Sequence, residues 1–169
     1  MLRTEYFYLF VIQGPSFLKE KLKLKECPLN IKVVDDIKPY KRRKVGILNG
    51  AHTAMVPVAY LAGLNTVGES MADQDIVEFV GNMLDNEIIP MLSMDKNELT
   101  EFRNSVMQRF ENPYIKHYLL SISLNSLTKF TTRLLPQLIS YANEKNQAPK
   151  NLSFSLASII LLLSRKKKQ

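Results

Sequence analysis

KVGILNGAHTA, residues 44–54, lies where the sequence changes from short apolar runs to helical periodicity, which begins at about residue 41. Within nine residues this stretch carries a lysine, an amide and an imidazole, namely Lys44, Asn49 and His52. On an α-helix Asn49 and His52 share a face, whereas Lys44 lies about 140° away from Asn49. These side chains can move a proton on a substrate oxygen and hold that oxygen. The structural alternative is a solvated lysine, a capping asparagine and a packed histidine.

Helical patterns continue downstream of this stretch. Residues 73–88 are expected to form an amphipathic helix capped by Asp73 or Ser70 and ended by Pro90. Asp95 and Glu98 resemble a capping box and predict the start of another helix. The apolar stripe of that helix comprises Leu99, Phe102, Val106 and Phe110.

The remaining third of the sequence predicts two more helices. One long helix is expected to follow Asn112 and Pro113 and to be disturbed near Pro136. Its expected inward residues are Ile115, Leu119, Ile122, Leu127 and Phe130. Residues 143–151 are predicted to be a loop, and 152–164 a last, buried helix. Before residue 41 only two short strands are expected, 6–13 and 31–35. The predicted fold is therefore mainly α, with short β segments at the N-terminal end.

Four stretches of the chain resemble one family of enzymes. They are VIQGP (11–15), VVDDIKPYKRRKVGILNGAHTAMVPVAYLAGLNTVGE (33–69), ENPYIKHYLLSISLNSLTKF (111–130) and RLLPQLI (133–139). They are similar to the C-terminal part of the polyol-specific long-chain dehydrogenases, the mannitol dehydrogenase family. In that family the pattern K-x4-N-x2-H supplies the catalytic residues, and it maps onto Lys44, Asn49 and His52. The resemblance also implies a helical C-terminal domain like that of 6-phosphogluconate dehydrogenase.

The resemblance implies an NAD-dependent oxidoreductase that needs no metal and interconverts D-tagaturonate and D-altronate. A fructuronate reductase or a polyol dehydrogenase of the same family is the close alternative. The six glycines, at positions 14, 46, 50, 63, 68 and 81, form no G-x-G-x-x-G turn. We therefore expect a fragment: residues 1–37 as the tail of a nucleotide-binding domain and the interdomain crossover, and 38–169 as the substrate-binding domain. NAD would be bound mainly by the missing N-terminal domain, and the fragment alone would be inactive.

A second group of basic residues is a candidate for binding the substrate carboxylate. Lys116 and His117 lie in NPYIKH, and Lys129 lies in SLTKF. On one continuous helix Lys116 and Lys129 would point about 140° apart, so both face one site only if the helix bends. Mannitol-type relatives carry an arginine eight residues before the lysine that matches Lys129. Here that position is Ser121, so the role of that arginine does not carry over.

The net charge of +7 raises the question of a nucleic-acid partner. The basic runs at 19–25, 38–44 and 165–168 come with no recognition motif and contain a single aromatic residue, Tyr40, so an anionic substrate or cofactor is favoured over nucleic acid. A non-catalytic basic helical binding domain remains the alternative of another class. Cys27 is the single cysteine, which fits a reducing cytoplasm. The apolar run 156–163 is too short to span a bilayer, so no membrane partner is expected.

Overall fold

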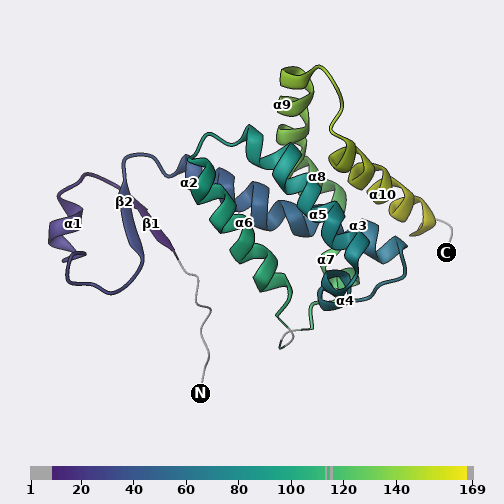
Figure 1. The fold of residues 1–169 in the computed structure, drawn as a ribbon, viewed down its shortest axis with the longest axis horizontal. Helices are drawn as coiled ribbons and strands as arrows, with labels where there is room; N and C mark the ends of the chain where they lie inside the picture. Colours follow the sequence, from purple (N-terminus) through teal and green to yellow (C-terminus); the bar gives the residue numbers. More distant parts are fainter. Residues whose placement is uncertain (1–8, 113, 115, 167–169) are drawn as a thin grey trace. The chain divides into compact units, whose positions relative to one another are not determined.

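The computed structural model describes residues 9–112, 114 and 116–166 (Figure 1). The described residues up to Arg42 form one compact unit, and those from Arg43 onward form a second. Helices make up most of the described chain, and its strands are confined to one two-stranded sheet. The predicted mainly α fold with short β segments at the N-terminal end is confirmed.

The first unit is built around a parallel pair of strands. β1 (Phe10–Gln13) and β2 (Ile31–Val34) run in register from Phe10 opposite Ile31 to Gln13 opposite Val34. Their connection contains the single helical turn α1 (Leu18–Lys21). Both strands agree with the predicted segments, although positions 6–8 of the first segment lie outside the described residues. After β2, α2 (Lys38–Arg43) begins where the Lys38 amide donates to Asp36 Oδ1 at 2.8 Å.

The second unit is helical throughout. Its elements are η1 (Lys44–Asn49), α3 (Gly50–Leu61), α4 (Val67–Ala72), α5 (Gln74–Met83), η2 (Leu84–Ile88), η3 (Ile89–Met91), α6 (Lys96–Phe110), α7 (Leu119–Ile122), α8 (Ser126–Arg133), α9 (Leu135–Lys145) and α10 (Lys150–Lys166). η1 and η2 are π-helical and η3 is a 3-10 turn. α3 packs against η1, α5, α7, α8 and α10, so it lies at the centre of this unit (Figure 1). Small and apolar side chains such as Ala51, Ala54 and Met55 allow this close packing and are fully buried.

The helix starts predicted at Asp73 and Asp95 are confirmed. Asp73 caps α5, because its Oδ1 accepts from the Ile76 amide at 3.1 Å. Asp95 caps α6 by accepting from the amides of Asn97 and Glu98. The apolar stripe predicted for α6 is buried in full. Pro90 does not end the helical path at once, since it occupies the first turn of η3, where a proline needs no amide hydrogen.

The long helix predicted after Pro113 is wrong. The structure has the short α7 and α8 instead, separated by Asn125, which adopts the left-handed conformation with φ 57°. Asparagine tolerates that conformation better than most residues, so the chain can turn there. The turn changes which side chains point inward: Leu127 is 49% exposed, contrary to the prediction, whereas Leu119 and Phe130 are buried as expected. Residues 113 and 115 lie outside the described residues.

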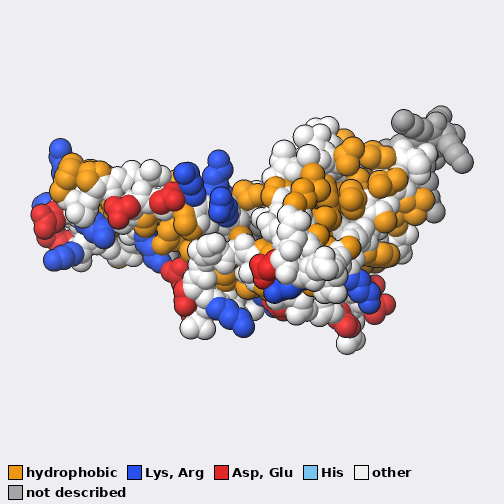
Figure 2. All heavy atoms as spheres, turned by 90° about the horizontal axis from the view of Figure 1, so that it is seen from above, with side chains coloured by type: hydrophobic (Ala, Val, Ile, Leu, Met, Phe, Trp, Pro, Cys, Tyr) orange, Lys and Arg blue, Asp and Glu red, His pale blue; other side chains and the backbone are white. Residues whose placement is uncertain are grey.

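The loop predicted at 143–151 is shorter than expected. α9 continues to Lys145, Asn146 is left-handed with φ 51°, and α10 begins at Lys150. α10 includes the predicted helix 152–164 but is only half-buried, because Leu152 and Ile159 face the core while Phe154 and Ile160 are exposed. Hydrophobic side chains gather on the surface toward the C-terminal end of the chain in Figure 2. The burial predicted for this helix therefore holds for one face only.

Gly63 ends α3 in a conformation that favours glycine. Its φ is +93°, its amide donates to Tyr60 O, and the next amide, of Leu64, donates to Ala59 O. These two bonds form a Schellman motif, which needs a left-handed residue at this position. We expect Gly63→Ala to lower the free energy of unfolding by about 1 kcal/mol, measured by urea denaturation. Gly68→Ala in α4 is the control: the new methyl group would have space, so stability should stay equal or rise, and equal losses in both variants would contradict this account.

Candidate active site

The three residues of the K-x4-N-x2-H pattern lie on one continuous helical path. Lys44 and Asn49 are the first and last residues of η1, and His52 lies in the first turn of α3. Asn49 and Gly50 both have right-handed helical dihedral angles, so the path is not interrupted between them. A π-helix bonds residue i to residue i+5, so Lys44 and Asn49 are one hydrogen-bonded turn apart. The angle of about 140° expected between Lys44 and Asn49 on an α-helix therefore does not apply to this π-helical turn.

The three side chains differ in exposure. Lys44 is exposed, whereas Asn49 and His52 are partly buried. The backbone oxygen of Asn49 accepts a hydrogen bond from Thr53 Oγ1 at 2.8 Å, which holds the start of α3. The side chain of Lys44 is thus accessible from solvent, while the amide of Asn49 and the imidazole of His52 are partly enclosed by the protein.

The imidazole of His52 is held by a ring contact. The imidazole stacks on Phe110 of α6, with the ring centroids 4.0 Å apart and the planes at 13°. Its Nε2 is buried and has no hydrogen-bond partner in the part of the chain that the structure describes. Burial is the main cause that lowers the pKa of His52 from 6.5 to about 4, and electrostatic interactions with His117, Arg109 and Arg133 contribute to the same shift. The ring is therefore neutral at pH 7 and can accept or donate a hydrogen bond.

The lowered pKa of His52 has a consequence for stability. Between pH 6.5 and about 4 the unfolded chain binds a proton at this position that the folded chain does not. The free energy of unfolding should therefore decrease as the pH falls through this window, by at most about 3 kcal/mol. Urea denaturation of wild type and His52→Gln at pH 7 and pH 4.5 checks this, and the wild type should lose more. Equal losses in the two proteins would show that His52 does not contribute.

Lys129 lies on α8 and is partly buried. Its Nζ donates to the backbone oxygen of Ile122 at 2.8 Å. Burial lowers the pKa of Lys129, and the positive charge of Arg133 adds to this effect. Arg133 also lowers the pKa of His52. The fold therefore places both Lys129 and the imidazole of His52 near the guanidinium of Arg133.

Lys116 and His117 lie before α7 and are both exposed. The backbone oxygen of His117 accepts from the Val67 amide at 3.0 Å, which ties this segment to the start of α4. His117 is close enough to His52 to lower the pKa of that ring. The structure thus brings His117 to the pattern residues, whereas Lys116 has no described contact with them.

Two basic residues near His52 were not found from the sequence. Arg109 lies in the last turn of α6, and Arg133 is the last residue of α8. Arg133 Nη1 donates to Thr53 Oγ1 at 3.1 Å, across 80 positions of the chain. The sequence did hold one signal for Arg133: it lies four residues after Lys129, so the two side chains share a face of one helix. That this face points toward α3 depends on the break in the helix at Asn125.

No three His, Cys, Asp or Glu side chains in the described part of the chain gather closely enough to hold a metal ion. No described helix has both the length and the apolar character that crossing a membrane requires.

A helical domain with a lysine, an amide and an imidazole on successive turns of one path is the arrangement expected from the resemblance. Comparison with known proteins shows which family the chain belongs to. Residues 36–169 match the mannitol dehydrogenase C-terminal domain family, and the chain belongs to that family. Altronate oxidoreductase of Yersinia pestis bv. Antiqua (strain Nepal516) is 57% identical over 157 residues, covering 93% of this chain and 32% of the relative. That of Cronobacter sakazakii (strain ATCC BAA-894) is 59% identical with the same coverage. The chain thus spans about a third of the length of the curated relatives it matches.

Solved structures agree with this family. Mannitol 2-dehydrogenase of Pseudomonas fluorescens, in a ternary complex with NAD and D-mannitol, has a TM-score of 0.69 and 25% identity. The similarity covers 79% of this chain and 27% of that one. A D-sorbitol dehydrogenase in substrate-free form shares the fold, with a TM-score of 0.73 at 23% identity. This similarity covers 79% of our chain and 28% of the sorbitol dehydrogenase chain.

Proposed function

We propose that this chain is the substrate-binding and catalytic domain of an NAD-dependent oxidoreductase that interconverts D-tagaturonate and D-altronate. The observation that carries this proposal is the 57–59% identity, over 93% of the chain, to altronate oxidoreductases. The retained spacing of Lys44, Asn49 and His52 on one helical path supports it. A non-catalytic binding domain would not need that arrangement.

Each pattern residue has a role in this chemistry. When NAD is bound, its nicotinamide supplies or accepts the hydride. Lys44 gives a proton to the oxygen of the reduced ketone, and in the reverse direction it takes the proton of the alcohol. Asn49 donates an amide hydrogen bond to the same oxygen, where negative charge develops. His52, neutral at pH 7, orients neighbouring hydroxyl groups of the sugar acid.

The basic side chains near His52 suit the carboxylate of a hexuronate. Lys129 is the best placed of the predicted residues, since it is partly buried on the helix that carries Arg133. His117 and Lys116 are exposed, and we assign them supporting roles at the edge of the site. A charge-assisted hydrogen bond to a carboxylate contributes about 1.5–3 kcal/mol.

We assign NAD binding mainly to an N-terminal domain outside this chain, so that domain and the hexuronate are the proposed partners. Within the described residues β1 leads to GPSF, with one glycine, and to a helix of four residues, which does not fit a pyrophosphate site. Residues 1–37 would be the end of the nucleotide-binding domain and the crossover, and 38–169 the substrate-binding domain. We place the enzyme in the cytoplasm.

The test is a rate measurement with the complete protein. NADH oxidation is followed with D-tagaturonate, D-fructuronate and D-fructose as substrates, and kcat/KM is compared. We expect D-tagaturonate to give the highest value. Preference for D-fructuronate would identify a fructuronate reductase, and preference for D-fructose a polyol dehydrogenase. No NADH oxidation with any of these ketones would overturn the proposed function.

A further inference from the structure

Arg133 is placed between two helices of the site. It ends α8 one helical turn after Lys129, is partly buried, and reaches α3 through the 3.1 Å hydrogen bond to Thr53 Oγ1. The same hydroxyl donates to Asn49 O at 2.8 Å. The guanidinium is therefore held against the helix turn that joins Asn49 to His52.

The described part of the chain provides no carboxylate that pairs with Arg133 or Lys129. For residues 9–112, 114 and 116–166, neither Arg133 nor Lys129 forms an ion pair, and their acceptors are the neutral oxygens of Thr53 and Ile122. The positive charge of Arg133 lowers the pKa of Lys129, so these two cations repel each other, and it also lowers the pKa of His52. His117, before α7, and Arg109, on α6, also lower the pKa of His52. A bound anion would relieve this repulsion, whereas a neutral ligand would not.

The guanidinium has the donors that such an anion needs. Arginine carries five N–H donors in a planar fork, and Thr53 is the described acceptor for one of them. The fork matches the two oxygens of a carboxylate, and the bond to Thr53 limits the rotamers that would otherwise have to be frozen on binding. A site that binds a charged group in this way discriminates strongly against an analogue without that group.

We propose that Arg133, together with Lys129, binds the carboxylate of the sugar-acid substrate and makes the site specific for hexuronates over neutral ketoses. This proposal rests on the proposed function and adds Arg133 as the residue that recognises the carboxylate of the substrate. Arg133 is thus a substrate-binding residue, and Thr53 is a positioning residue, because its hydroxyl orients the guanidinium.

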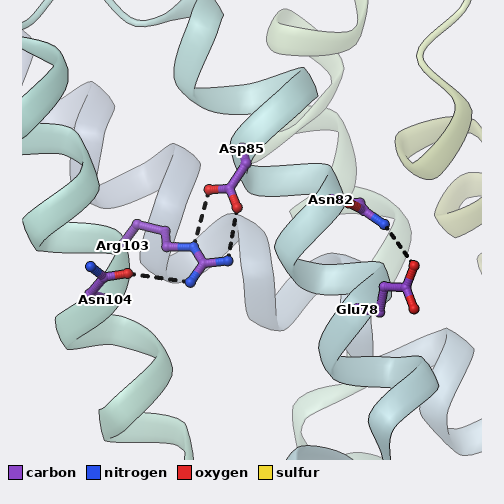
Figure 3. Close-up of polar contacts among 5 residues, drawn as sticks. All are labelled: Glu78, Asn82, Asp85, Arg103 and Asn104. Atoms are coloured by element: carbon purple, nitrogen blue, oxygen red, sulfur yellow. Dashed lines mark hydrogen bonds and ion pairs between the residues drawn. The ribbon is translucent and has the colours of Figure 1, made fainter.

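The experiment uses the complete protein and a matched pair of substrates. D-Tagaturonate and D-tagatose differ by a carboxylate in place of a hydroxymethyl group. The variants are Arg133→Gln, Arg133→Lys and Thr53→Val. The control is Arg103→Gln, since Arg103 of α6 forms an ion pair with Asp85 of η2 at 2.9 Å and is not assigned to the site (Figure 3). Thermal unfolding is recorded for every variant.

We expect Arg133→Gln to raise KM for D-tagaturonate at least about tenfold and to change kcat/KM for D-tagatose less than about twofold. Arg133→Lys should give an intermediate KM, because it keeps the charge and loses the fork. Thr53→Val should raise KM in the same direction by a smaller factor, and Arg103→Gln should leave both substrates unchanged.

Two results would overturn the assignment. If Arg133→Gln lowers kcat/KM equally for both substrates, or only lowers the unfolding temperature, Arg133 is a structural tie between α8 and α3. If the wild type does not reduce D-tagaturonate, the proposed function itself fails, and that outcome is separate because it appears without any substitution.

Discussion

Replacing Lys44 with alanine in the complete protein should lower kcat for D-tagaturonate reduction at least about a hundredfold. Groups that act as general acid or base typically contribute 10²–10⁴-fold. Lys44 is the exposed lysine at the start of η1, one π-helical turn from Asn49, and we assign it to the reacting oxygen. Because it is not assigned to the dinucleotide, the Kd for NADH should stay nearly unchanged. Steady-state kinetics and an NADH titration measure the two quantities.

Rescue with a small primary amine separates proton transfer from a packing defect. The alanine variant leaves space where the lysine stem was, so added ethylamine should recover part of kcat with a dependence on pH. Asn49→Ala should also lower kcat, but amine should not restore it, because an amide supplies a hydrogen bond and no titrating group. A Lys44→Ala enzyme that keeps more than about a tenth of the wild-type kcat would exclude Lys44 as the acid or base.

Replacing Glu87 with alanine should produce the largest loss of stability among these substitutions. Glu87 lies on η2, is 3% exposed, and accepts three hydrogen bonds from the start of α10. They come from the Asn151 amide at 2.7 Å, Asn151 Nδ2 at 2.8 Å and the Leu152 amide at 2.8 Å. A carboxylate at a helix N-terminus satisfies amides that have no partner within the helix and interacts favourably with the helix dipole. Its removal buries unpaired donors, and we expect the free energy of unfolding to fall by about 3 kcal/mol.

Chemical denaturation of the complete protein checks the Glu87 prediction. Glu87→Gln should cost less than Glu87→Ala, since the amide oxygen still accepts from one donor. Glu144→Ala is the matched control, because Glu144 is exposed and its ion pair in the described part of the chain is with the neighbouring Lys145, at 2.7 Å. That control should lose less than about 0.5 kcal/mol. A loss for Glu87→Ala no larger than for Glu144→Ala would show that the cap of α10 does not contribute to stability.

The sequence by itself determined the features that depend on neighbours along the chain. The mainly α fold, the two short strands, and the helix starts at Asp73 and Asp95 follow from periodicity and capping within a few residues. The family followed from dense motif matches, above all the K-x4-N-x2-H pattern at Lys44, Asn49 and His52. Local rules work here because one helical turn or one cap involves residues at most five apart.

Only the tertiary structure decided the features that join distant segments. The π-helical start at Lys44, the left-handed turn at Asn125 and the Glu87 cap of α10 have no clear local signal. The hydrogen bond from Arg133 to Thr53 joins residues 80 positions apart, and it forms only because α8 begins directly after the turn at Asn125. The physical reason is that backbone propensities at such positions differ by about 1 kcal/mol or less, while packing and buried hydrogen bonds contribute several times as much. The members of the pattern could therefore be identified in the sequence, but their surroundings, including the cations that face His52, come from the packing of the helices.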